Sequence, residues 1–166
     1  MSFPATFRLK NFRNLAAAAA VLLTPALAHG GSGPFADFAG NWSGSGSITI
    51  AESGTERIRC RGTYSVNSDG STLNQVLRCA SDSYKFELTS NVAAKGNNLT
   101  GSWSEVSRNV NGSIEGSISG GQVNALVTAN GYAATFVMSA RGSRQSVNIS
   151  SKGEIRGVTI SLAKGN

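Results

Sequence analysis

The sequence predicts an all-β protein, a single up-and-down antiparallel meander of about eight to ten strands that closes into a soluble barrel with one cross-strand disulfide. Three observations predict it. After Ala28, apolar and polar residues alternate almost continuously, which is the period of a half-buried strand rather than of a helix. Short turns rich in Gly, Asn and Asp interrupt the alternation at regular intervals. The two cysteines of the chain, Cys60 and Cys79, lie at equal distances on either side of Asp69-Gly70.

The cysteine pair predicts both a strand register and a compartment. Asp-Gly favours a two-residue type I′ turn, because both central residues of that turn need a positive φ. Such a turn would place Cys60 directly opposite Cys79 on adjacent antiparallel strands, with Cα atoms about 5.5 Å apart or closer. That separation suits a disulfide, and disulfides are typical of oxidising compartments.

The N-terminal residues have the pattern of a signal peptide. Three basic residues precede an apolar run at residues 15–28, which ends in the small-x-small tripeptide Ala26-Leu27-Ala28. The run is shorter than the roughly 20 apolar residues that span a membrane, and Pro25 interrupts it. We therefore expect cleavage after Ala28 and a periplasmic or secreted protein with no membrane span in the mature chain.

The expected organisation is a signal peptide over residues 1–28, a flexible segment over residues 29–40 and a β-barrel domain over residues 41–164. The three basic residues of the leader account for half of the formal net charge of +6. The charge that remains does not favour a nucleic-acid partner, and none is expected.

Each strand is placed by the turn that keeps its apolar residues on the same face as those of the strand before it. The first strand carries Trp42 to Ile50 on its inner face, and the second carries Ile58 to Val66. A three-residue loop at Ser53-Gly54-Thr55 joins them, because a two-residue turn would place isoleucines beside arginines. The inner faces of the later strands are expected at residues 73–79, 84–90, 99–105, 112–118, 123–127, 132–138, 145–149 and 158–162.

Further turns join these strands in chain order. They are expected at Lys95-Gly96, Arg108-Asn109, Gly120-Gly121, Asn130-Gly131, Gly142-Ser143 and Lys152-Gly153. Strands joined by short hairpins are neighbours, and a long twisted meander keeps exposed edges unless it closes on itself. Polar outward positions, such as Arg59 and Thr63, argue against an outer-membrane barrel. An immunoglobulin-like sandwich would need long crossovers and usually a disulfide between its sheets, whereas the expected Cys60–Cys79 bridge links neighbouring strands.

The residues that usually carry hydrolytic or metal chemistry are scarce. His29 is the only histidine, so no Ser-His-Asp triad or multi-histidine site can form. Both cysteines are assigned to the disulfide. Of the acidic residues only Glu105 points inward in the expected register, whereas a glycosidase needs a pair of carboxylates. The sequence therefore predicts a protein that is not an enzyme and has no metal site and no cofactor.

The inner face predicts a candidate ligand site. Inward glycines, such as Gly44, Gly62 and Gly101, leave volume beside aromatic side chains. The predicted ligand-binding residues are Trp42, Tyr64, Gln75, Phe86, Trp103, Glu105 and Tyr132. A cavity of about 300 Å³ or more would favour a small-molecule site. The alternative is that the glycines flatten the barrel and the aromatic side chains fill it as an ordinary core.

The outer face predicts a second candidate site. Arg59, Arg61 and Arg78 share this face, and the hairpin register places Arg61 directly across from Arg78. Like charges in opposite positions are unfavourable, so an anionic or envelope partner is one explanation of the cluster. The alternative is that the long side chains spread into solvent and cover the strands with their stems.

Two short motifs resemble the calycin group of barrels, which comprises lipocalins, fatty-acid-binding proteins and avidins. Gly40-Asn41-Trp42 is similar to the Gly-x-Trp that begins the first strand of these barrels, and Gly62-Thr63-Tyr64 matches the second-strand motif of avidins. A second copy of the first motif occurs at Gly101-Ser102-Trp103. The chain also resembles uncharacterised exported proteins of α-proteobacteria. The first resemblance implies a ligand-binding barrel, and biotin binding is not implied because only two tryptophans exist.

Two functions follow from these patterns. The first is an exported barrel that binds a small apolar or amphipathic molecule in its interior. The alternative is a non-catalytic interaction or inhibitor module of the cell envelope, which would act through its outer surface and loops.

Overall fold

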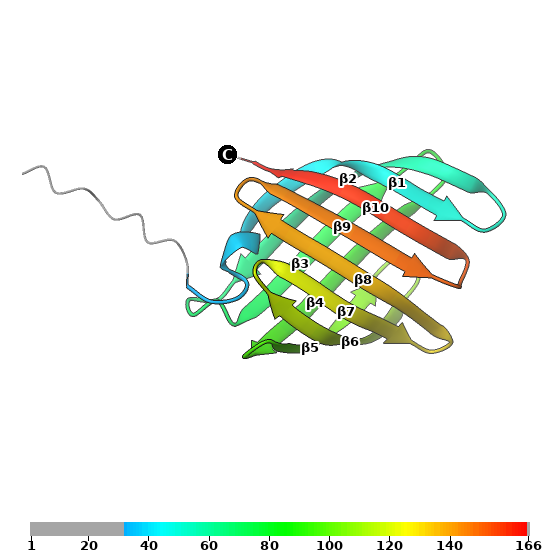
Figure 1. Ribbon diagram of the computed structural model, residues 1–166. Helices are drawn as coiled ribbons and strands as arrows, with labels where there is room; N and C mark the ends of the chain where they lie inside the picture. Colours follow the sequence, from blue (N-terminus) through cyan, green and yellow to red (C-terminus); the bar gives the residue numbers. More distant parts are fainter. Residues whose placement is uncertain (1–31, 166) are drawn as a thin grey trace, which may run out of the picture.

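The protein is a closed barrel of ten antiparallel strands, as Figure 1 shows. The computed structural model describes residues 32–165 of the 166-residue chain. The strands are β1 (Gly40–Ile50), β2 (Gly54–Val66), β3 (Thr72–Ala80), β4 (Lys85–Lys95), β5 (Asn98–Glu105), β6 (Val110–Ser119), β7 (Gln122–Ala129), β8 (Tyr132–Arg141), β9 (Arg144–Ser151) and β10 (Ile155–Lys164). Each pairs with its neighbours in sequence, and β1 pairs with β10 to close the barrel. The predicted all-β, up-and-down closed barrel is confirmed.

The seam between β1 and β10 depends on two glycines. Gly44 pairs with Leu162 and Gly46 with Ile160. A Cβ atom at Gly44 would lie 2.0 Å from the carbonyl oxygen of Ser161, and one at Gly46 would lie 1.9 Å from that of Thr159. Any side chain at these positions would therefore force the two strands apart.

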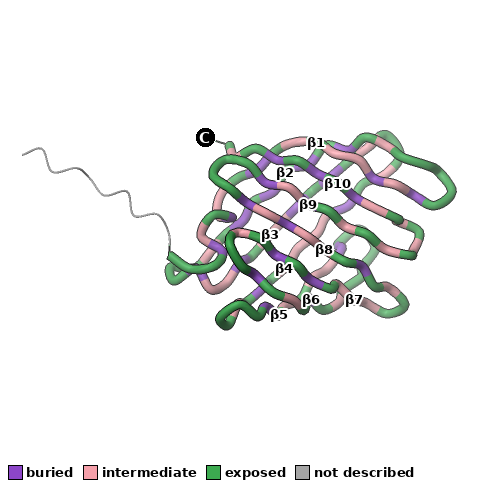
Figure 2. Tube along the Cα trace, viewed as in Figure 1, coloured by how far each residue is buried: buried purple, intermediate pink, exposed green. Residues whose placement is uncertain are grey.

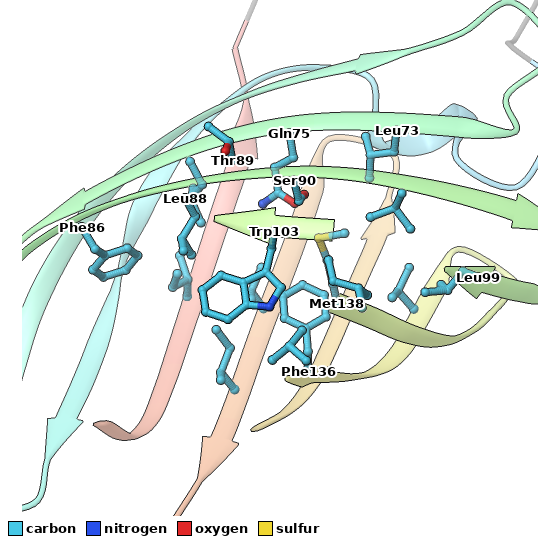
Figure 3. A pocket seen from close by; sticks show the side chains of 18 of the residues that line it. Leu73, Gln75, Phe86, Leu88, Thr89, Ser90, Leu99, Trp103, Phe136 and Met138 are labelled. Atoms are coloured by element: carbon cyan, nitrogen blue, oxygen red, sulfur yellow. The ribbon is translucent and has the colours of Figure 1, made fainter. Parts of the chain in front are cut away.

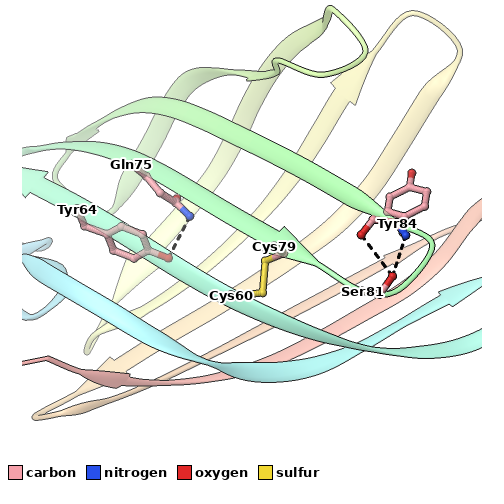
Figure 4. The surroundings of a disulfide bond; sticks show 6 residues. All are labelled: Cys60, Tyr64, Gln75, Cys79, Ser81 and Tyr84. Carbon is pink, nitrogen blue, oxygen red and sulfur yellow. Dashed lines mark hydrogen bonds between the residues drawn. A yellow bond between two sulfur atoms is a disulfide. The ribbon is translucent and has the colours of Figure 1, made fainter.

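The predicted disulfide is present, and its register is confirmed. Cys60 pairs with Cys79 on adjacent strands, with Cα atoms 4.1 Å apart (Figure 4). The turn differs from the expected type I′ turn, since the amide of Gly70 donates to the carbonyl of Asn67 and Asp69 has no positive φ. Gly70 alone takes the left-handed conformation, with φ of 70°. This longer loop has the same centre as the expected turn, so both give the same strand pairing.

Four other turns are displaced from their expected positions, the first by two residues and the others by one. The β1–β2 loop is 51–53 rather than 53–55. Lys95 pairs with Asn98, so the β4–β5 turn is Gly96-Asn97. Gly101 pairs with Ile114, whereas the sequence predicted Gly116 opposite it. Gly157 pairs with Ser150, so the β9–β10 loop is centred one residue beyond Lys152-Gly153. In every case the strand pairing shifts by an even number of residues, so the inward set of residues is unchanged.

The N-terminal segment closes one end of the barrel. Residues 36–38 form a short 3-10 helix, η1 (Ala36–Phe38), and the side chains of Phe35 and Phe38 are 1% and 0% exposed. The amide of Phe35 donates to the carbonyl of Gly70 over 3.0 Å. This part of the segment was expected to be flexible, and in the structure it is packed instead. The remaining prediction there, a signal peptide cleaved after Ala28, lies outside the described residues.

Buried residues alternate with exposed ones along the strands, as the purple and green stretches in Figure 2 show. One hydrophobic core lies inside the barrel and includes Trp42, Ile48, Ile58 and Ile160. Among residues 32–165 no helix is long and apolar enough to span a membrane. The disulfide is a bond typical of oxidising, non-cytoplasmic compartments.

Candidate functional site

The barrel encloses an apolar cavity of about 120 Å³. Inward side chains of β3 to β10 form its wall, together with Phe35 from the N-terminal segment. In Figure 3 the indole of Trp103 projects into the middle of these side chains. Those labelled there are Leu73, Gln75, Phe86, Leu88, Thr89, Ser90, Leu99, Trp103, Phe136 and Met138. The volume is below the roughly 300 Å³ expected of a site for a drug-sized ligand.

A short chain of hydrogen bonds makes the polar corner of the cavity. The Gln75 amide nitrogen donates to the Tyr64 hydroxyl over 3.1 Å (Figure 4), and the Ser90 hydroxyl donates to the Gln75 amide oxygen over 3.2 Å. The three residues are opposite one another on β2, β3 and β4. Burial raises the pKa of the Tyr64 phenol, so the hydroxyl stays protonated. Gln75 and Ser90 line the cavity, and Tyr64 holds Gln75 in place from behind.

Trp103 and Tyr132 form an aromatic pair on the cavity wall. Their ring centroids are 6.2 Å apart in an edge-to-face arrangement, and the Trp103 indole nitrogen donates to the carbonyl of Thr128 over 3.2 Å. Both residues are only half-buried. Gly112 is necessary for this arrangement, because a Cβ there would lie 1.7 Å from the Thr128 carbonyl oxygen and 2.8 Å from the indole nitrogen.

Arg108 connects the β5–β6 loop to the aromatic residues at the same end of the barrel. Its guanidinium carbon lies 4.3 Å from the centroid of the Tyr84 ring, and Tyr84 in turn contacts Phe86 edge-to-face at 6.3 Å. Phe86 lines the cavity. Burial raises the pKa of Tyr84, and the neighbouring charge of Arg108 opposes that shift. A cation and a half-buried phenol thus lie next to the cavity wall.

Glu105, which the sequence placed among the ligand-binding residues, organises a loop instead. Its carboxylate accepts hydrogen bonds from the backbone amides of Glu87, Ser107 and Arg108 at 3.0, 3.2 and 2.7 Å. It also lies 3.6 Å from the Arg108 guanidinium. Burial acts to raise the pKa of Glu105, but these backbone amides outweigh it and hold the pKa below its ordinary value. The carboxylate therefore fixes the β5–β6 loop.

We expect Glu105→Gln to destabilise the protein by about 1–2 kcal/mol at neutral pH, because an amide replaces an ionised acceptor of three backbone bonds. Since folding lowers the pKa of Glu105, its ionised form stabilises the protein above the ordinary value of 4.5, and that contribution is lost as pH falls below it. Urea unfolding of both proteins at pH 7 and pH 3 measures this. If Glu105→Gln lowers the free energy of unfolding by the same amount at pH 7 and at pH 3, the role assigned to the ionised carboxylate is wrong.

Trp42 also lies outside the cavity wall. Its indole nitrogen donates to the Phe38 carbonyl over 2.8 Å, and its ring packs against Tyr64 with centroids 6.4 Å apart. The ammonium of Lys164 lies 5.3 Å from the centroid of the Trp42 ring. Trp42 therefore anchors η1 to the closed end of the barrel.

Four of the seven predicted ligand-binding residues line the cavity: Gln75, Phe86, Trp103 and Tyr132. The sequence reasoning missed Phe35, Phe136 and Met138, which also line it. The alternation of β8 already placed Phe136 and Met138 on the inner face. The signal for Phe35 was the pair of aromatic residues, three apart, just before the first strand.

On the outer face, Arg61 and Arg78 are opposite each other as predicted. Arg78 forms a two-bond ion pair with Glu87 on β4, at 2.7 and 2.9 Å, and this pairing holds the pKa of Glu87 below its ordinary value. Arg59 and Arg61 are exposed beside it. Of the three arginines predicted to bind an anion, Arg78 is therefore already paired with a carboxylate of the protein.

Comparison with known proteins shows the same class of fold, a closed barrel. The crystal structure of Rv2717c from M. tuberculosis matches with a TM-score of 0.60 and 9% sequence identity, over 78% of this chain and 94% of that chain. The S-type phycobiliprotein lyase CPES from Guillardia theta matches with a TM-score of 0.55 and 13% identity, over 80% and 90% of the two chains. No family model matches the chain, and no curated protein matches its sequence.

Identities this low show a shared fold and nothing more. The barrel agrees with the calycin resemblance at the level of fold. The resemblance to exported proteins of α-proteobacteria stays a prediction.

Proposed function

We propose that this protein is an exported barrel that binds a small apolar or amphipathic molecule, with a compact apolar group seated in the interior cavity. The observation that carries the proposal is the interior space of about 120 Å³, lined by aliphatic and aromatic side chains around one hydrogen-bonded polar corner. An apolar cavity of about 150 Å³ in a protein core holds benzene or xenon. The cavity is thus suited to a single ring or a short alkyl group.

An amphipathic ligand would place its polar end at the rim formed by Tyr84, Arg108 and Tyr132. The Arg108 side chain is 43% exposed and already stacks on Tyr84, so it is available to an anionic or hydroxyl group. Burial raises the pKa of Tyr132, which remains a neutral hydrogen-bonding phenol at neutral pH.

We propose binding without catalysis. One of the similar structures is named a lyase, so the barrel by itself does not separate binding proteins from enzymes. The support lies in the polar groups around the cavity, which are engaged in fixed structural bonds. Gln75 is held by Tyr64 and Ser90, and Glu105 accepts three backbone amides. A general acid or base needs instead to reach the proton that it transfers.

The proposed location is the periplasm or the extracellular medium. The disulfide supports it, because such bonds persist in oxidising compartments. The signal-peptide pattern of residues 1–28 agrees with the same location.

Substitution of one cavity residue tests the proposal. We expect wild-type protein to bind fluorobenzene, observed by fluorine NMR, and Val127→Phe to weaken that binding at least tenfold, because the added ring occupies the cavity. Leu126→Phe is the matched control, since Leu126 is the preceding residue on β7 and is 50% exposed. Both variants must first show the wild-type circular dichroism spectrum.

Native mass spectrometry of protein recovered from its own cells then identifies the natural molecule. A bound mass that Val127→Phe loses and Leu126→Phe keeps is the expected result. Equal fluorobenzene binding by all three proteins would overturn the cavity as the binding site.

A further inference from the structure

We propose that the outer face of the barrel binds a linear anionic polysaccharide in a shallow trough that crosses the strands. This role is independent of the interior cavity. Two surface hollows make the trough, one of about 910 Å³ over β1 to β4 and one of about 680 Å³ over β8, β9, β10 and β1. They share Ser43 and Gly44, so they form one continuous depression.

The length of the trough suits a polymer better than a single small anion. It crosses seven strands, from β8 through β10 and β1 to β4. Neighbouring strands are about 4.8 Å apart, so the path along the surface is on the order of 30 Å. A flexible polymer that follows the curved outer surface of the barrel across the strands would contact both hollows at once.

The net positive charge of the described chain is concentrated in this trough. Residues 32–165 contain twelve Lys and Arg and nine Asp and Glu. Six of these cations line the trough, namely Arg59, Arg61, Arg78, Lys85, Arg141 and Arg144, against one carboxylate, Glu87. The other described residues carry more acidic than basic side chains, so a polyanion is attracted to this face rather than to the molecule as a whole.

The register places these cations at both sides of a floor of small side chains. On one side Arg61 pairs with Ser43, and Arg59 and Lys85 lie on either side of Ala80. On the other side Arg141 pairs with Arg144 across the β8–β9 hairpin. Two pairs of like charges, Arg61 with Arg78 and Arg141 with Arg144, thus face each other across strands. Glu87 already offsets the charge of Arg78, so a bound anion would chiefly relieve the repulsion between Arg141 and Arg144.

The floor between the two arginine groups favours a saccharide over a nucleic acid. It consists mainly of small and hydroxyl side chains, including Ser43, Ser45, Ser161 and Ser146. Hydroxyl groups both donate and accept hydrogen bonds, which matches the hydroxyls of a sugar chain. Proteins that bind single-stranded nucleic acid present aromatic side chains for base stacking. In the described part of the chain, every Trp, Tyr and Phe is buried or half-buried.

Affinity measurements with the full chain and defined polymers test this inference. We expect binding to heparin, a sulfated polysaccharide, that weakens as salt rises, and no binding to neutral dextran of similar length. Arg61→Ser/Arg144→Ser removes one charge from each side of the trough and is expected to weaken heparin binding at least tenfold. Lys95→Ser/Lys152→Ser removes the same charge outside the trough and is expected to change it less than twofold.

A second variant tests the floor itself. Ser45→Asp places one exposed carboxylate between the arginine groups and is expected to weaken heparin binding at least tenfold while leaving the melting temperature and fluorobenzene binding unchanged. Equal losses in the trough and control variants would show unspecific attraction and overturn the proposal. Tighter binding of a single-stranded oligothymidylate than of heparin would overturn its saccharide part.

Discussion

The Cys60→Ser/Cys79→Ser variant is expected to melt more than ten degrees below the wild-type protein while keeping its β-sheet circular dichroism spectrum. The bond joins residues 19 positions apart in sequence. The chain-entropy model gives about 3 kcal/mol for closing a loop of this length. A domain of this size loses about 4 °C for each kcal/mol, which leads to the expected shift.

The fold should survive the loss because the β2–β3 hairpin has other determinants of its register. Gly62 pairs with Leu77 and Tyr64 with Gln75 on either side of the same ladder, and the Asn67–Gly70 turn does not involve sulfur. Reduced wild-type protein is the control, since it loses the cross-link but keeps both buried sulfur atoms. A melting temperature unchanged in both samples would contradict the stabilising role of the bond.

Gly46→Val is expected to prevent stable closure of the barrel. Its Cβ would lie 1.9 Å from the carbonyl oxygen of Thr159, and that contact is with backbone, which cannot rotate away as a flexible side chain can. The strands β1 and β10 would have to separate, and each backbone group left unpaired in the core costs about 1–3 kcal/mol. Several such losses together are comparable with the whole free energy of unfolding of a typical domain, about 5–15 kcal/mol.

Ser45→Val is the matched control, because Ser45 is the adjacent residue on β1 and its side chain is exposed. Valine is favourable in a strand, so this variant should retain the wild-type stability. Thermal unfolding and the elution volume in size-exclusion chromatography measure the two variants. A monomeric Gly46→Val protein that melts at the wild-type temperature would show that the pairing of β1 with β10 does not require glycine at position 46.

The alternation of the sequence determined which residues face inward, but only some of the turns. The registers at Gly120-Gly121, Asn130-Gly131 and Gly142-Ser143 were predicted correctly. The loop after Ile50 was displaced by two residues, and the loops after Lys95, Glu105 and Ser151 were displaced by one. Each displacement moves the strand pairing by an even number of residues, and because side chains repeat with a period of two, every apolar position stays on the same face.

The candidate site was harder to predict than the fold. Inward position alone brought Gln75, Phe86, Trp103 and Tyr132 to the cavity wall. It did not reveal that Glu105 turns toward backbone amides, because the loop that supplies those amides has no periodic pattern. It also did not reveal that Phe35, which precedes the first strand, is buried and lines the cavity, because its place depends on packing in the folded chain.

The pairing of β1 with β10 also determines the order in which the chain can fold during synthesis. Nine of the ten ladders join strands that are consecutive in sequence, so each hairpin can form soon after its second strand emerges. The ladder between β1 and β10 joins the earliest described strand to the latest. Until Ile155–Lys164 has emerged, β1 keeps a free edge that can pair with another nascent chain. The last strand therefore closes the barrel. A chain truncated before Ile155 would leave two strand edges unpaired, and such edges are prone to aggregation.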